Sequence, residues 1–363
     1  MILVIVIATA LAFDFTNGFH DTANAVATSI STRALPPRTA VTIAAILNFA
    51  GAFISLAVAA TVASGIVNAL FITTTIVFAG LVGAIAWNLV TWYFGLPSSS
   101  SHALIGGVVG AAFAAAGPDA ILFGGILDKV IIPALVAPVL AFVVAGMGIL
   151  VAYRIVARQR PGPVNRGFRV GQIASGSLLA LSHGTNDAQK TMGIITLALI
   201  ANGNLPEEGF QVPTWVVVSA ATAIAAGTYV GGWRIIKTMG SRIIKMDPAQ
   251  GFAAQSSGAA VILAATHFGF PLSTTHVISG AVMGSGAAKR LSAVRWGVAG
   301  NIVVAWVLTL PAAAAVGALT YGVTRIFGTG ALGPVLVASG LLIALAVVFV
   351  PRIIQGRTLT AEP

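Results

Sequence analysis

The chain has 363 residues, of which 57% are hydrophobic and only 8% are charged, and its formal net charge is +10. Soluble globular domains are about one quarter charged, so the composition excludes an ordinary soluble protein and predicts an all-α polytopic membrane protein, with room for roughly ten to twelve crossing or re-entrant segments. The basic residues are scattered between apolar runs, which argues against a nucleic-acid partner. The chain has no cysteine, which excludes disulfides and thiolate metal sites.

The first half begins with an apolar segment over residues 2–32 that carries ionisable groups in its centre. We call residues 13–25, FDFTNGFHDTANA, the first charged motif. A glycine beside polar residues at this depth predicts a helix broken at Asn17 and Gly18. Asp14 has no acidic counterpart later in the chain. We expect it to line an entry path or to lie near the outer interface.

Apolar runs in the rest of the first half predict two more spans, over residues 39–63 and 130–156, with a hairpin between them. An apolar run over residues 76–94 ends at GLPSSSSH, and a glycine-rich run then continues to residue 116. Two short helices that meet at such a Pro-Ser tip predict a re-entrant hairpin over residues 76–116.

The same order of elements then recurs. Residues 179–192, LALSHGTNDAQKTM, form the second charged motif, in which Asp187 takes the place of Asp21. The sequence GFPLSTTH repeats the pattern of GLPSSSSH and predicts the tip of a second hairpin over residues 250–290. Further spans are expected at residues 213–233, 296–322 and 333–350.

This internal duplication predicts the domain organisation. We expect a first repeat over residues 1–157, a basic cytoplasmic linker over 158–168, a second repeat over 169–325, and a C-terminal span and tail over 326–363. With the N-terminus outside, the loop acids Asp119, Asp128, Glu207 and Glu208 are external, and nearly all of the 19 basic residues, Arg357 included, face the cytoplasm; the exceptions are Lys129, Lys190 and Arg325.

The two repeats are then inverted relative to each other, because the first begins outside and the second begins inside. Inverted repeats with broken helices and re-entrant hairpins are the architecture of many secondary transporters, in which equivalent elements meet near the bilayer midplane. The charged motifs and the hairpin tips should therefore converge on one site.

Hydroxyl residues begin the return arm of each predicted hairpin, where free N–H groups and the helix dipole favour an anion. A helix-capping role would explain one such tip, but two mirrored copies favour an anion site. The candidate anion ligands are Ser99, Ser100, Ser101, Ser273, Thr274 and Thr275, with Lys190 as a further candidate.

The carboxylates of Asp21 and Asp187 would repel an anion, so a cation or a proton must accompany it. Asn24, one helical turn after Asp21, adds an oxygen suited to a hard cation such as sodium. In the second motif Lys190 takes the place of that asparagine, so its ammonium can stand where a cation would bind, or it can pair with Asp187. Asn17 and Asn186 are further candidate ligands of the coupling ion, and no resident metal is predicted.

A second group of polar residues lies in or beside the same motifs. Histidines at these positions can carry protons or orient a neighbour, although a membrane histidine more often packs or forms a structural hydrogen bond. The group consists of Ser98, His20, His102, His183, His276 and Gln255.

Four segments in this order, GFHDTANAVAT, GLPSSSSH, SHGTNDAQK and GFPLSTTH, resemble the PiT family of inorganic phosphate transporters, and the resemblance covers essentially the whole chain. It implies a homodimer that imports phosphate by alternating access, driven by sodium or protons and without a cofactor. Sodium-coupled members carry an asparagine where this chain has Lys190. That departure is similar to the low-affinity bacterial branch, which takes up phosphate with protons, often as a neutral metal-phosphate complex, across the plasma membrane of a prokaryote.

Three other functions are alternatives to phosphate transport. A transporter of sulfate or another oxyanion is the nearest alternative, because hydroxyls and helix ends bind any tetrahedral anion. Acceptors such as Asp21 favour phosphate, which can donate a hydrogen bond. An intramembrane hydrolase built from Ser98 and His102 lacks a GxSxG elbow, and a passive anion channel gives the paired acids no purpose. The sequence therefore predicts a transporter and not an enzyme.

Overall fold

The computed structural model describes residues 2–206, 209–328 and 330–354, with side chains as far as residue 343. The described chain forms helices and no multi-residue strand. Four of these helices are long and apolar enough to cross a membrane, and a fifth span results if a bent pair is counted as one. The main helices are α1 (Ile2–Ser31), α2 (Pro37–Gly51), α3 (Ala57–Ser64), α4 (Thr74–Phe94), α5 (Ser100–Ala116), α6 (Phe123–Ile126), α7 (Ile132–Val156), α8 (Pro161–Ala201), α9 (Thr214–Val230), α10 (Trp233–Lys237), α11 (Pro248–His267), α12 (Thr274–Lys289), α13 (Trp296–Ile326) and α14 (Leu332–Ile354).

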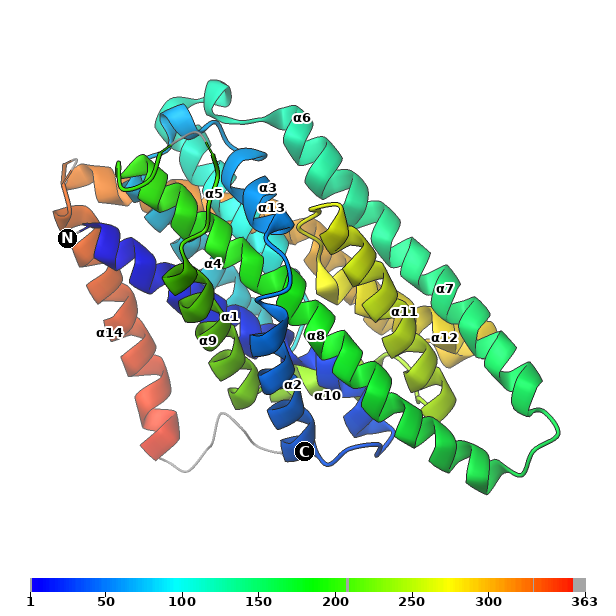
Figure 1. Ribbon diagram of the computed structural model, residues 1–363. Coiled ribbons are helices and arrows are strands. Elements are labelled where there is room, and N and C mark those ends of the chain that lie inside the picture. The colour runs from blue at the N-terminus through cyan, green and yellow to red at the C-terminus, as the bar shows by residue number, and fades with distance from the viewer. Residues whose placement is uncertain (1, 207–208, 329, 355–363) are drawn as a thin grey trace.

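The helices α1 and α8, which carry the two charged motifs, cross in the middle of the bundle (Figure 1). They run in opposite directions. Asp14, early in α1, faces Thr191, late in α8, whereas the Thr32 hydroxyl just after α1 donates to Gln172, early in α8, at 2.9 Å. This antiparallel crossing brings the centres of the two motifs together.

The break predicted at Asn17 and Gly18 is wrong, because α1 runs as one helix through both residues. Gly18 instead lies where α1 crosses α9, and a β-carbon there would overlap the carbonyl oxygen of Ile224. Breaks occur in two other predicted spans. The span over residues 39–63 divides into α2 and α3, and the chain bends by 60° between α9 and the short helical segment Trp233–Arg242.

The crossing at Gly18 predicts a stability change that can be measured. We expect Gly18→Ala to lower the free energy of unfolding by about 1–3 kcal/mol, because the added methyl group must push two backbones apart. Thermal unfolding of the protein in detergent measures this change. Gly300→Ala is the matched control, since Gly300 also lies inside a helix but has no neighbour within 4 Å of the added carbon. An equal melting temperature for both variants would contradict the close crossing.

At the positions of the two predicted hairpins, α4 packs against α5 and α11 packs against α12, and their re-entrant character stays a prediction. Gly95 and Gly269 follow the first arms with φ of 65° and 70°, a backbone conformation that favours glycine. Ser99 and Ser273 then cap the return arms, accepting hydrogen bonds from the backbone N–H of His102 and His276 at 3.0 and 3.2 Å. The tips are buried inside the bundle, as expected for re-entrant hairpins.

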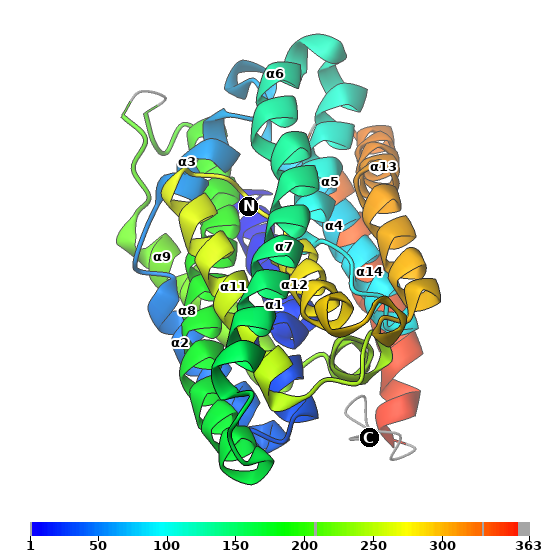
Figure 2. The same ribbon diagram turned by 90° about the vertical axis from the view of Figure 1, so that its right-hand side faces the viewer.

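Each hairpin packs against the long helix that ends the other half of the chain. The hairpin α4–α5 packs on α13, and α11–α12 packs on α7. Figure 2, turned by 90° from Figure 1, shows α13 beside α4 and α5 at one side of the molecule. The two halves therefore hold each other's hairpins, and neither forms the site alone.

The connection between the halves is shorter than the predicted linker over residues 158–168. Helix α8 begins at Pro161, so only residues 157–160 separate it from α7. Glu207, Glu208 and Arg357, which entered the predicted topology, lie outside the described residues, as does the end of the predicted C-terminal tail. The assignment of residues 1–157 and 169–325 as inverted repeats stays a prediction.

Candidate substrate and ion site

The hairpin tips lie against the charged motifs of α1 and α8 in the interior of the bundle. None of the tip residues 98–102 and 273–276 is more than 4% exposed, and Asp21, Asp187 and Lys190 are equally buried. The site is therefore closed to solvent on both sides. It brings together the tip hydroxyls, the two acids, Asn24 and Lys190, as the sequence predicted.

A tip hydroxyl in each half binds the acid of that half. The Ser100 hydroxyl lies 2.6 Å from Asp21 Oδ2, and the Thr274 hydroxyl donates to Asp187 Oδ2 at 3.2 Å. Ser100 and Thr274 occupy equivalent positions of the tips GLPSSSSH and GFPLSTTH. The same contact thus occurs twice. In the first half Asn17 Oδ1 also lies 2.7 Å from the Ser100 hydroxyl and holds it in place.

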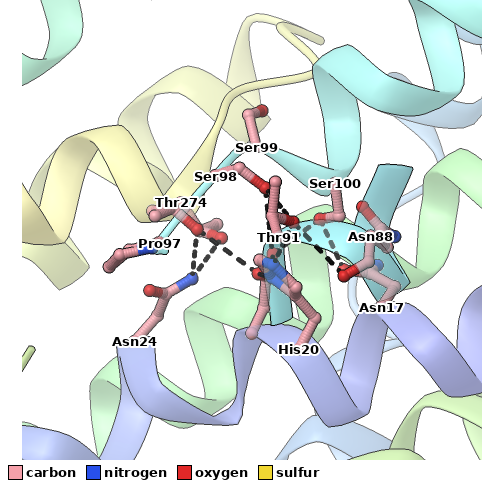
Figure 3. Close-up of polar contacts among 12 residues, drawn as sticks. Asn17, His20, Asn24, Asn88, Thr91, Pro97, Ser98, Ser99, Ser100 and Thr274 are labelled. Atoms are coloured by element: carbon pink, nitrogen blue, oxygen red, sulfur yellow. Dashed lines mark hydrogen bonds and ion pairs between the residues drawn. The ribbon is translucent and has the colours of Figure 1, made fainter. Parts of the chain in front are cut away.

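A second contact, also made twice, links each charged motif to the tip of the other half. The Asn24 carboxamide donates to the Thr275 hydroxyl at 2.9 Å and to Thr274 at 3.2 Å (Figure 3). At the equivalent positions, the Lys190 ammonium donates to the Ser101 hydroxyl at 2.5 Å. It also donates to the Leu272 carbonyl at 2.8 Å and forms an ion pair with Asp187. Lys190 is therefore surrounded by oxygen atoms, as a bound cation would be.

Three potential cation ligands meet beside Lys190. One ligand atom from each of Asp21, His183 and Asp187 lies within 4.8 Å of the others, and all three residues are buried. Carboxylate oxygens suit hard cations such as sodium, whereas an imidazole nitrogen suits transition metals. Two acidic residues and one ammonium therefore meet at this point of the site.

A histidine contacts each acid. His20 Nδ1 lies 2.6 Å from Asp21 Oδ1, and its Nε2 lies 3.1 Å from the hydroxyl of Thr91 on α4. His183 Nε2 lies 3.0 Å from Asp187 Oδ2, and Asn48 of α2 holds the other ring nitrogen at 3.2 Å. These contacts fix the orientation of each carboxylate and give each acid a partner that can exchange a proton.

Comparison with known proteins assigns the family. A model described as the phosphate transporter family matches residues 17–165 and 156–317. The chain belongs to the phosphate transporter family.

Several relatives are similar over most of their length. The chain is 57% identical to the probable low-affinity inorganic phosphate transporter of Mycobacterium tuberculosis (strain ATCC 25618 / H37Rv), over 90% of this chain and 78% of the relative. It is 46% identical to the protein of the same description from Bacillus subtilis (strain 168), over 88% of this chain and 96% of the relative. A solved structure, described as the sodium-dependent phosphate transporter, is 25% identical, with a TM-score of 0.81 over 90% of this chain and 99% of that one.

The hydrolase alternative loses its support in this family of transporters. The Ser98 hydroxyl donates to the Thr91 hydroxyl at 2.8 Å, and Figure 3 shows both beside His20. The His102 ring instead packs edge-on against His276, with centroids 4.9 Å apart. Ser98 and His102 therefore do not form a nucleophile and its base.

The side chains of three candidate residues contact groups other than the tip hydroxyls. Asn186 donates to the Thr266 hydroxyl and the Phe270 carbonyl, and so it positions the second tip from behind. Gln255 donates to Thr28 and Ser29 further along α1, and it accepts from Ser175 of α8. His276 stacks on the Trp306 ring at 4.0 Å. We assign these three residues to holding the hairpins in position.

Thr91 is a site residue that the sequence did not indicate. It lies in the apolar helix α4 and accepts the Ser98 hydrogen bond beside His20. A single threonine in an apolar helix usually bonds its own backbone, as Thr91 also does with the Trp87 carbonyl. Only its position near the end of the apolar run that leads into GLPSSSSH could have drawn attention to it.

Proposed function

We propose that this transporter imports inorganic phosphate across the plasma membrane of a prokaryote, coupled to protons, by alternating access. The observation that carries the proposal is the doubled contact between tip hydroxyl and acid, Ser100 with Asp21 and Thr274 with Asp187, in one buried site. The family assignment and the relatives described as phosphate transporters agree with it.

The anion would bind between the two hairpin tips. Helices α5 and α12 both begin at the site, so their first N–H groups and dipoles favour a negative charge there. On binding, the anion would replace the present acceptors of the tip hydroxyls, so that Ser99, Ser100, Ser101, Ser273, Thr274 and Thr275 donate to its oxygens. The Lys190 ammonium can add a charge-assisted hydrogen bond.

The acids favour phosphate over sulfate. A carboxylate can only accept hydrogen bonds, so Asp21 and Asp187 oppose a fully ionised anion and bind one that keeps a proton. Phosphate at neutral pH carries such a proton and sulfate does not. The transport of sulfate is therefore the alternative that the experiment must exclude.

Proton coupling follows from the asymmetry between Asn24 and Lys190. Where Asn24 leaves its Oδ1 unpaired for a cation, the ammonium of Lys190 fills the equivalent position. That half of the site then has no place for sodium. A coupled proton needs no cation site, because a carboxyl or an imidazole can carry it. A neutral metal-phosphate complex would need no sodium site either.

Alternating access would use the two halves as moving parts. The site is closed on both sides, and each hairpin packs on the other half of the chain. Separation of either tip from α1 or α8 would open one side of the site. We propose that residues 1–157 and 169–325 act as the inverted repeats of a homodimeric transporter with its N-terminus outside.

Uptake of labelled phosphate into proteoliposomes tests the proposal. We expect accumulation under an inward proton gradient, reduced by excess phosphate but not by excess sulfate. Sulfate uptake without phosphate uptake would overturn the substrate. Uptake driven by a sodium gradient alone would overturn the coupling ion.

The tip hydroxyls give a further prediction. Ser100→Ala and Thr274→Ala should each raise the KM for phosphate about tenfold or more, because a hydrogen bond to a charged group contributes about 1.5–3 kcal/mol. Initial rates of uptake measure this change. Ser64→Ala, which removes a hydroxyl from the exposed residue Ser64 of α3, is the control. An unchanged KM in both tip variants would remove these hydroxyls from the anion site.

A further inference from the structure

Asp14 is a buried acid that the proposed site does not use. It lies on α1, 0% exposed, and neither carboxyl oxygen has a hydrogen-bond partner among the described residues. Asp14 is thus enclosed by the bundle, and its expected place along an entry path or near the outer interface stays a prediction. An ionised carboxyl that is buried without a partner costs several kcal/mol. A protonated carboxyl avoids that cost.

The helical register places Asp14 on the same side of α1 as Asp21. The two acids are seven residues apart, which is close to two turns and about 10 Å along the axis. Asp14 lies nearer the N-terminal end of α1, so it forms a second polar layer next to the proposed site.

Three other polar residues form this layer with Asp14, and all are buried. The Thr191 hydroxyl and the Asn17 carboxamide face the Asp14 carboxyl, and Asn88 lies on α4, which packs on α1. Figure 3 draws Asn88 together with Asn17. Thr191 Oγ1, Asn17 Nδ2 and both amide atoms of Asn88 have no hydrogen-bond partner within the described part of the chain. We call Asp14, Asn17, Asn88 and Thr191 the Asp14 cluster.

The cluster can serve both protonation states of the carboxyl. A protonated Asp14 needs an acceptor, which the Thr191 oxygen supplies, and a donor, which the Asn17 amide supplies. An ionised Asp14 can accept from both groups. The charged groups that face Asp14 are Asp187 and Lys190 of α8, which are already paired with each other. Helices α4 and α9, which also pack on α1, contribute no charged residue.

Asp14 has no acidic equivalent in the second charged motif. When Asp187 is aligned with Asp21, the equivalent of Asp14 in the second motif is Ala180, which is apolar. Lys190 is likewise the equivalent of an uncharged residue, Asn24. In acidic residues and lysines the two motifs thus differ at two aligned positions, where one copy adds a lysine and the other adds an aspartate. The added base fills a cation's place, and the added acid supplies a place for a proton.

We propose that Asp14 is a proton-binding site of this transporter, separate from the anion site, and that it carries a coupled proton. Asp14 holds the proton as a neutral acid in the closed conformation described here. It takes that proton up from one side of the membrane and releases it to water on the other. This role rests on the proposed function, since a proton is coupled only if a substrate is transported.

Infrared spectroscopy of the purified protein tests the protonation without any transport. We expect wild type at neutral pH to show the C=O stretching band of a protonated carboxylic acid, and Asp14→Asn to lose it. Asp128→Asn, a change at an exposed acid, should leave the band in place. A wild-type spectrum without this band, or an unchanged band in Asp14→Asn, overturns the proposal.

Transport assays test the coupling. In Asp14→Asn we expect accumulation driven by a proton gradient to fall about tenfold or more, as for the loss of roughly 1.4 kcal/mol of coupling. Exchange of phosphate across vesicles at equal pH should fall much less, and Asp14→Glu should restore accumulation. Wild-type accumulation and an unchanged proton-to-phosphate ratio in Asp14→Asn would overturn the role. If wild type itself transports no phosphate, the proposed function fails, whereas the infrared result still decides the protonation of Asp14.

Discussion

Asp21→Asn and Asp187→Asn should each lower proton-driven accumulation of phosphate by about 100-fold or more, which corresponds to roughly 2.7 kcal/mol. Each substitution removes the carboxylate that the tip hydroxyl of its own half binds. It also removes the carboxylate oxygen that contacts the adjacent histidine. An asparagine of the same shape cannot carry a proton, so the gradient no longer drives uptake. Labelled-phosphate uptake into proteoliposomes measures the loss.

The two variants should differ in stability. Asp187→Asn leaves the Lys190 ammonium buried without its ion-pair partner, which costs about 3–5 kcal/mol. Asp21→Asn leaves no ammonium unpaired. We therefore expect a lower melting temperature for Asp187→Asn than for Asp21→Asn. The double variant Asp187→Asn with Lys190→Asn should recover stability without recovering proton-driven accumulation, as a double-mutant cycle can measure.

Asp119→Asn is the control for these acids, because Asp119 is exposed in the loop after α5 and is predicted to be external. It should transport as wild type does. Normal accumulation in both Asp21→Asn and Asp187→Asn would remove the two acids from the mechanism. Loss in only one of them would show that the two halves of the site are not equivalent.

The convergence of the tips and the acids followed from the sequence, because duplication supplied a second copy of each motif. The recurrence of GLPSSSSH as GFPLSTTH predicted two hairpins, and both tips reach the acids. A single serine-rich turn would have been explained by helix capping, which Ser99 and Ser273 do provide. The recurrence of hydroxyl residues at two mirrored tips favoured an anion site over simple capping, which residue type alone could not do.

The path of α1 could not be predicted, because glycine serves two structural roles. Gly18 beside Asn17 fits a broken helix, but it equally fits a close helix crossing. The choice depends on α9, which is distant in the sequence and places the Ile224 carbonyl against Gly18. Thr91 was missed for a similar reason, since its partners Ser98 and His20 become neighbours only when the hairpin folds back.

The partners of Lys190 were predicted only in part. Its spacing from Asp187 indicates an ion pair one helical turn apart, and that pair is present. Its contacts with Ser101 and the Leu272 carbonyl join elements that are far apart in the sequence. No local pattern contains those contacts. Their equivalent in the first motif is the contact of Asn24 with Thr275, which also joins a charged motif to the tip of the other half.

Lys190→Asn should make phosphate uptake depend on sodium. The substitution gives the second motif the same carboxylate and carboxamide pair as Asp21 and Asn24. Without the ammonium, the Asp187 carboxylate, the Ser101 hydroxyl and the Leu272 carbonyl leave a charged oxygen cage that suits a hard cation. We expect a sodium gradient to stimulate uptake by the variant about tenfold or more, and uptake by wild type hardly at all.

The control for this change is Lys245→Asn, which removes an exposed ammonium from the chain between α10 and α11. It should keep the wild-type response to sodium. Lys190→Met separates the loss of charge from the gain of a ligand, because methionine fills the space but offers no oxygen to a hard cation. If sodium stimulates Lys190→Asn but not Lys190→Met, the ammonium stands in the place of a cation that the carboxamide helps to bind. If neither responds, Lys190 acts on the anion directly, and the KM for phosphate should then rise in both variants.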